Sequence, residues 1–153
     1  FLCESTEGLL LDWKLYRDRA PGEYVQMKES LQRQQAFDLE QPIEALGADR
    51  GFASQAARRL LAGQDIYDAM APRQVDTMVE RMQEPRFVQL QRRRAGTEGR
   101  IGTLKNRWQG GRLRAKGFEN RALAVGWSVL SHNLWQIAKR LAQEAEQRQT
   151  RAA

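Results

Sequence analysis

Apolar and polar residues along the first 70 positions follow a pattern that predicts strands and helices in turn. In residues 9–16 the period is two: Leu9, Leu11, Trp13 and Leu15 share one face and alternate with Leu10, Asp12, Lys14 and Tyr16. Pro42 ends a helical stretch, and Ser54 is a plausible N-cap for the next helix. The predicted elements are strands over 1–4, 9–16, 43–48 and 65–70 and helices over 23–39 and 54–61. Such an alternation is typical of an α/β protein with a partly parallel sheet.

The remaining chain, from about Arg73, predicts helices. Pro85 separates a short helix from a longer one over 86–108, and Gln109-Gly110-Gly111 ends the longer helix before a basic loop or short extended segment over 112–116. A long last helix is predicted over 120–149. In that helix an apolar residue recurs after alternately four and three positions, which predicts one stripe that covers a sheet or a partner. The stripe consists of Leu123, Trp127, Leu130, Leu134, Ile137 and Leu141.

Composition narrows the class of protein. A chain of 153 residues with 41% hydrophobic residues fits a single domain that buries a real core. We find neither an apolar run long enough for a membrane nor a signal peptide, and the single cysteine, Cys3, excludes an internal disulfide and fits a reducing cytosol. His132 is the only histidine and lies off the apolar stripe, so we expect a capping or surface role for it.

The formal charge of +6 is distributed unevenly. Residues 86–116, here called the basic segment, carry ten Arg or Lys and a single acid, whereas residues 1–85 are acidic overall. Such asymmetry indicates a polyanionic partner, most simply nucleic acid. The alternative is an ordinary solvated basic face.

The one acid of the basic segment, Glu98, lies on the same helical face as Arg94 and Lys105. A carboxylate kept in such a positive field suits a bound metal ion or a phosphate-transfer site. Spacing alone favours a simpler explanation, a weak salt bridge between Arg94 and Glu98 one turn apart.

Three short motifs, in order along the chain, resemble a known family. Arg94-x3-Glu98-x6-Lys105 is similar to the signature Tyr-x2-Arg-x3-Glu-x6-Lys of bacterial insertion-sequence transposases of the Asp-Asp-Glu (DDE) type, with Gln91 at the tyrosine position. Ala-Asp-Arg-Gly-Phe at 48–52 resembles the segment that carries the family's second catalytic Asp, here Asp49. Residues 125–134 resemble the family's C-terminal helix.

The resemblance implies a ribonuclease H-like fold, a mixed sheet with flanking helices. The family begins with three antiparallel strands, the first of which carries the first catalytic Asp. This chain has room for two strands before its first helix, so we expect a partial catalytic domain that lacks the first strand. Its α/β part would cover 1–70, and its helical part, with the long C-terminal helix, 71–153. Asp12 is expected to be an exposed strand residue and not a substitute for the missing Asp.

The resemblance also implies DNA transposition by cutting and joining phosphodiesters. Asp49 and Glu98 would be catalytic carboxylates that converge on Mg²⁺ or Mn²⁺ in a two-metal mechanism. With one carboxylate missing, residues 1–153 are expected not to cleave DNA alone. The expected DNA contacts are Arg94, Arg100, Lys105, Arg107, Arg112, Arg114 and Lys116.

The implied partners are transposon-end and target DNA, bound by a homo-oligomer in the bacterial cytoplasm at the nucleoid, without a membrane. Two other classes of function stay open. The chain could be a non-catalytic nucleic-acid-binding module that uses the basic segment. It could also be a helical interaction domain whose partner surface is the stripe over 123–141.

Overall fold

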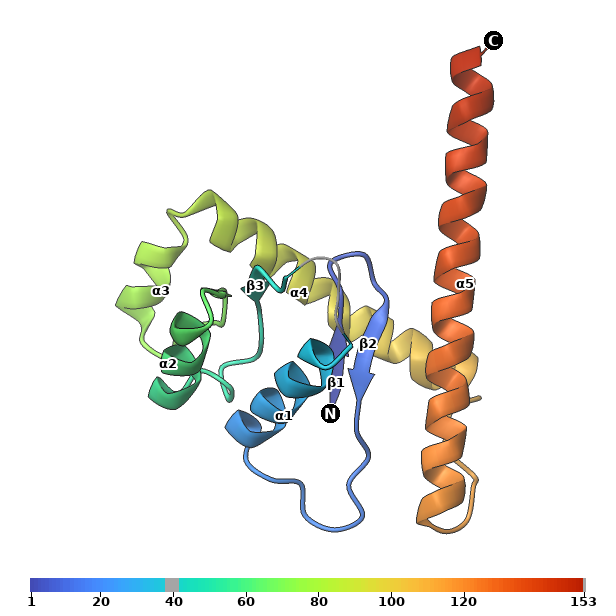
Figure 1. Ribbon diagram of the computed structural model, residues 1–153, viewed down its shortest axis with the longest axis horizontal. Coiled ribbons are helices and arrows are strands. Elements are labelled where there is room, and N and C mark those ends of the chain that lie inside the picture. The colour runs from blue at the N-terminus through green and yellow to red at the C-terminus, as the bar shows by residue number, and fades with distance from the viewer. Residues whose placement is uncertain (38–41, 153) are drawn as a thin grey trace. The chain divides into compact units, whose positions relative to one another are not determined.

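The computed structural model describes residues 1–37 and 42–152 and shows a mixed α/β chain in which helices dominate (Figure 1). The chain divides into two compact units. Unit 1 contains Phe1 and residues 12–98, and unit 2 contains residues 2–11 together with the chain from Gly99 onward. None of the helices in the described ranges combines the length and the hydropathy that crossing a bilayer requires.

Unit 1 begins with two helices that match their predicted positions. Helix α1 (Glu23–Gln35) ends earlier than predicted, and residues 38–39 of the predicted helix lie outside the described residues. Helix α2 (Gln55–Gly63) starts at Ser54, whose Oγ accepts a hydrogen bond of 3.1 Å from the backbone N–H of Ala57. This confirms the predicted N-cap, which satisfies a donor that the first turn leaves unpaired.

Strands β3 (Ala45–Leu46) and β4 (Tyr67–Asp68) lie on either side of α2 in the sequence and pair in parallel. The predicted parallel arrangement is therefore confirmed. The expected single mixed sheet is not found: the described strands form two separate pairs, β1–β2 and β3–β4. The β3–β4 ladder is only two residues long, so it offers few backbone groups for a wider sheet.

The core of unit 1 lies between α1, α2 and the β3–β4 pair. Its buried members are Met27, Leu31, Ala53, Ala57, Leu61, Ile66 and Met70.

Helices α3 (Val75–Arg81) and α4 (Pro85–Thr103) follow these elements in the sequence. Phe87 is fully buried, with the Arg81 guanidinium 4.6 Å from its ring, and it anchors the first turn of α4.

Strand β2 (Leu10–Trp13) pairs with β1 (Leu2–Glu4), and its buried face is the reverse of the one that its alternation suggests. Leu10 is buried and Leu11 is exposed. Asp12 is also not the exposed strand residue that we expected. Its carboxylate is only 10% exposed and accepts two hydrogen bonds, of 3.0 and 2.7 Å, from the guanidinium of Arg33 on α1. The prediction failed because a bidentate ion pair makes the burial of a charge tolerable.

Unit 2 is organised by the long helix α5 (Phe118–Ala152), which extends beyond both ends of its predicted range. Asn133 of α5 pairs with the backbone of Leu10: Oδ1 accepts from its N–H at 2.8 Å, and Nδ2 donates to its C=O at 2.9 Å. The side-chain amide thus acts as a strand neighbour would. Before α5, the end of α4 continues into one π-helical turn, η1 (Leu104–Trp108).

The two faces of α5 differ from the prediction. His132 is 1% exposed and its Nε2 lies 3.0 Å from the carbonyl oxygen of Gly8, so the expected surface role is wrong. Ser128 and Val129 are buried with it. The six residues of the apolar stripe are 45–62% exposed, so the stripe does not cover a sheet of the described chain.

Candidate functional site

Helix α4 crosses the carboxyl ends of the two parallel strands of unit 1. The side-chain amide of Gln91 donates to the carbonyl oxygen of Ala69, immediately after β4, at 2.6 Å. One turn of helix further on, Arg94 donates from Nη1 to Oδ1 of Asp49, which follows β3. The carboxyl ends of parallel strands are where open α/β folds place their ligands. The predicted Asp49 therefore stands at a position suited to a site.

The turn that carries Asp49 is held from several sides. The backbone N–H groups of Phe52 and Ala53 donate to the carbonyls of Asp49 and Arg50 at 3.0 and 3.2 Å. Gly51 leaves room for the Glu23 carboxylate, because a Cβ at this position would lie 2.2 Å from Glu23 Oε1. With its backbone fixed in this way, Asp49 presents a side chain that is 69% exposed.

The guanidinium of Arg73 adds to this support. It donates to the carbonyl oxygens of Arg50 and Gly51, both at 3.4 Å. Neither Gln91 nor Arg73 was among the predicted site residues. The tyrosine position of the motif was a signal for Gln91, whereas nothing in the local sequence points to Arg73.

Glu98 follows Arg94 by four residues and lies on the same face of α4, about 6 Å further along the axis. The expected Arg94–Glu98 salt bridge is absent from the described contacts, because the Arg94 guanidinium binds Asp49 instead. Glu98 is exposed, and within the described ranges no side chain pairs with it. Arg94 thus binds the Asp49 carboxylate, and Glu98 lies one helical turn further along the same face of α4.

The two carboxylates, Asp49 and Glu98, would provide only some of the ligands that a hard cation needs. Carboxylate oxygens are the ligands that Mg²⁺ and Mn²⁺ prefer, and Mg²⁺ is often held by one or two carboxylates with water completing its shell. Asp49 and Glu98 could provide two such ligands. A cluster of three or more His, Cys, Asp or Glu side chains is not found where the structure describes the chain.

Two of the predicted DNA contacts have partners within unit 2. Arg100 donates two hydrogen bonds to Glu4 from one guanidinium edge, Nε to Oε2 at 2.9 Å and Nη2 to Oε1, and the Glu4 carboxylate is only 10% exposed. The Arg107 guanidinium lies 5.3 Å from the ring of Trp108 and 4.8 Å from that of Trp135. Both cations therefore also stabilise the fold of their unit.

The other predicted contacts of unit 2 point to solvent. These residues are exposed, and in the described part of the chain none has an ion-pair partner: Lys105, Arg112, Arg114 and Lys116. The loop that carries most of them contains Gly110, Gly111 and Gly117 with positive φ, a conformation that glycine adopts without strain. The cations are thus presented on an irregular segment that can follow a polyanion.

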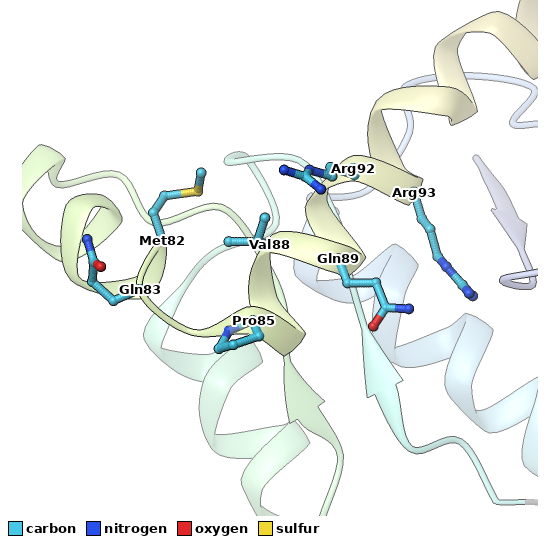
Figure 2. Close-up of a pocket in the computed structure, with 7 residues that line it drawn as sticks. All are labelled: Met82, Gln83, Pro85, Val88, Gln89, Arg92 and Arg93. Atoms are coloured by element: carbon cyan, nitrogen blue, oxygen red, sulfur yellow. The ribbon is translucent and has the colours of Figure 1, made fainter.

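A pocket of about 440 Å³ opens where α3 meets α4 (Figure 2). Its lining combines apolar side chains with two arginines of the basic segment on the same helix, α4, a combination that suits a group with an apolar and an anionic part. Our site prediction did not include these residues, although the run Arg92-Arg93-Arg94 was a signal. The lining consists of Met82, Gln83, Pro85, Val88, Gln89, Arg92 and Arg93.

We compared the chain with protein-family models, with curated proteins and with solved structures, and found no match in any of the three.

Proposed function

We propose that this chain is part of the catalytic core of a DDE-type DNA transposase with a ribonuclease H-like fold. The observation that carries the proposal is the contact between Arg94 and Asp49 at the carboxyl end of β3. It joins the two separate motifs that resemble the family, and Arg94 shares its helical face with Glu98. The two motifs are 45 residues apart in the sequence, and this contact between them supports the proposal that they belong to one site.

Within this proposal each residue has a chemical role. Asp49 and Glu98 would hold Mg²⁺ or Mn²⁺, and the ion would activate the attacking oxygen and stabilise the leaving one. Arg94 neutralises the Asp49 carboxylate and holds it against α4. The exposed cations Lys105, Arg112, Arg114 and Lys116 would bind backbone phosphates of transposon-end and target DNA. The host compartment would be the bacterial cytoplasm at the nucleoid.

Binding of Mn²⁺, followed by electron paramagnetic resonance, tests the carboxylate pair directly. Asp49→Asn and Glu98→Gln should each weaken Mn²⁺ binding by about tenfold or more, since each removes a ligand oxygen charge. Glu80→Gln is the matched control, because it removes the same charge from an exposed helical position in unit 1. Mn²⁺ affinity that is equal in all four proteins would refute the shared site.

A second function is favoured by the exposed cations. Four of the predicted DNA contacts stand without partners in the described chain, and they need no metal to bind a polyanion. The alternative is therefore a nucleic-acid-binding module without catalysis. This alternative would be favoured if the chain binds DNA and if its Mn²⁺ affinity is the same in the wild type, Asp49→Asn and Glu98→Gln.

A further inference from the structure

The apolar stripe of α5 contains most of the large hydrophobic residues that are exposed in the described part of unit 2. Its six residues are 45–62% exposed, while the opposite face of the same helix is buried around His132. Isolated exposed leucines are ordinary, but a continuous stripe over five turns is not. α5 therefore buries one face, around His132, on its own unit and leaves its apolar stripe exposed.

The spacing of the stripe is that of a coiled-coil seam. Steps of four, three, four, three and four residues place Trp127, Leu134 and Leu141 at a positions and Leu123, Leu130 and Ile137 at d positions. Apolar residues with this spacing pack against a second helix that has the same spacing. We propose that α5 binds α5 of a second copy of this chain as an antiparallel pair centred on residue 132, without DNA.

The antiparallel register follows from the sizes and positions of the six residues. With residue 132 at the centre, Leu123 meets Leu141 of the partner subunit, Trp127 meets Ile137 of the partner subunit, and Leu130 meets Leu134 of the partner subunit. All six residues are covered in both copies, and each tryptophan lies opposite a smaller side chain. A parallel pair would instead place Trp127 against its own copy and Glu144, the next d position, against another Glu144.

The positions that flank the seam also favour self-association. The e positions contain Ala124, Ser131 and Ala138, small side chains that recur every seven residues and let two helices approach closely. The charged g positions within the overlap are Glu119 and Arg140, which carry opposite charges, and the Arg140 guanidinium already binds Glu7 of its own chain. No like charges would therefore face one another across the seam.

The buried area is adequate for a dimer. Covering six half-exposed side chains would remove on the order of 600 Å² of apolar surface from each copy, close to the ~800 Å² per partner of a standard interface. The helices would overlap over residues 118–146, which is all helical in the structure. The proposal is independent of the DNA chemistry proposed above.

Sedimentation equilibrium of the purified chain at about 100 μM, without DNA, is the first test. We expect twice the monomer mass of 17.6 kDa. Leu130→Glu with Leu134→Glu should return the mass to that of the monomer, because two charges would be buried at the centre of the seam. Gln143→Glu with Thr150→Glu adds the same charges on the polar face of α5 and should leave the dimer intact. A wild-type monomer, or a dimer that survives the leucine changes, overturns the proposal.

A distance between spin labels tests the register separately. The six stripe residues are unchanged in this experiment, so it does not depend on the leucine variants. Spin labels on Gln143→Cys, with Cys3→Ser, should be about 33 Å apart along the helix axis in the antiparallel pair. A parallel pair would bring them to about 10 Å. The long distance supports the proposal and the short one overturns it.

Discussion

The basic segment 86–116 contains two groups of cations that its sequence does not distinguish. In the first group the guanidinium binds an acid far away in the chain: Arg86 with Glu44, Arg94 with Asp49, and Arg100 with Glu4. In the second group, which includes Lys105, Arg112, Arg114 and Lys116, the side chain is exposed, with no such acid in the described residues. A run of positive charge is thus divided between holding the fold and remaining free for a polyanion.

The division follows the secondary structure. The paired arginines lie on α4, a regular helix that holds each side chain in a fixed direction toward the neighbouring strands and turns. Most of the free cations lie in the glycine-containing loop that follows η1. Removing a paired arginine should therefore change stability, whereas removing a free one should change binding.

The largest effect on stability is expected for Arg100→Ala. The Glu4 carboxylate is 10% exposed, so loss of its bidentate cation should lower the free energy of unfolding by about 2–3 kcal/mol. Arg114→Ala, from the free group, should change it by less than about 0.5 kcal/mol. Urea unfolding of both variants measures the difference. Equal effects would show that the two groups are not distinct.

The free group should dominate DNA binding. Arg112→Ala, Arg114→Ala and Lys116→Ala together should reduce the slope of log K against log salt by up to about 2.7, which is roughly 0.9 for each phosphate contact on duplex DNA. The free energy of unfolding should change little. Fluorescence anisotropy with duplex DNA at several salt concentrations measures the slope. A slope that the triple variant leaves unchanged would place the DNA contacts elsewhere.

A smaller effect on stability is expected from Asp12, the acid that pairs with Arg33 in unit 1. Burial alone would raise the pKa of Asp12, but the hydrogen bonds and charge of Arg33 hold that pKa below its ordinary value of 3.8. The ionised form therefore stabilises the fold fully above about pH 4, and this contribution is lost as the pH falls through the lowered folded pKa. The stability advantage of the wild type over Asp12→Asn should shrink from pH 5 to pH 2.5.

Arg33→Met serves as the control for this pH dependence, because it removes the partner and leaves the carboxylate. Its stability profile should lose the same acid-dependent contribution as that of Asp12→Asn. A gap between wild type and Asp12→Asn that stays constant down to pH 2.5 would contradict the role assigned to the Asp12–Arg33 pair.

Much of the fold was predictable because its signals are local. The Ser54 cap, the break at Pro85, the parallel β3–β4 pair and the long last helix all follow from spacing and from residues adjacent in the sequence. The candidate site was predictable only as a set of residues. That Arg94 meets Asp49 and not Glu98 depends on a contact between residues 45 positions apart, which no helical periodicity encodes.

The sequence by itself determined the order of the elements, the charge of the basic segment and the heptad spacing of α5, since each depends on neighbours within a few residues. Only the tertiary structure decided which cations are paired, which face of β2 is buried, and which side of α5 packs on its own unit. Asn133 and His132 illustrate the reason. Their hydrogen bonds to Leu10 and Gly8 join residues more than 120 positions apart, and these bonds, together with burial, turn the apolar stripe of α5 outward.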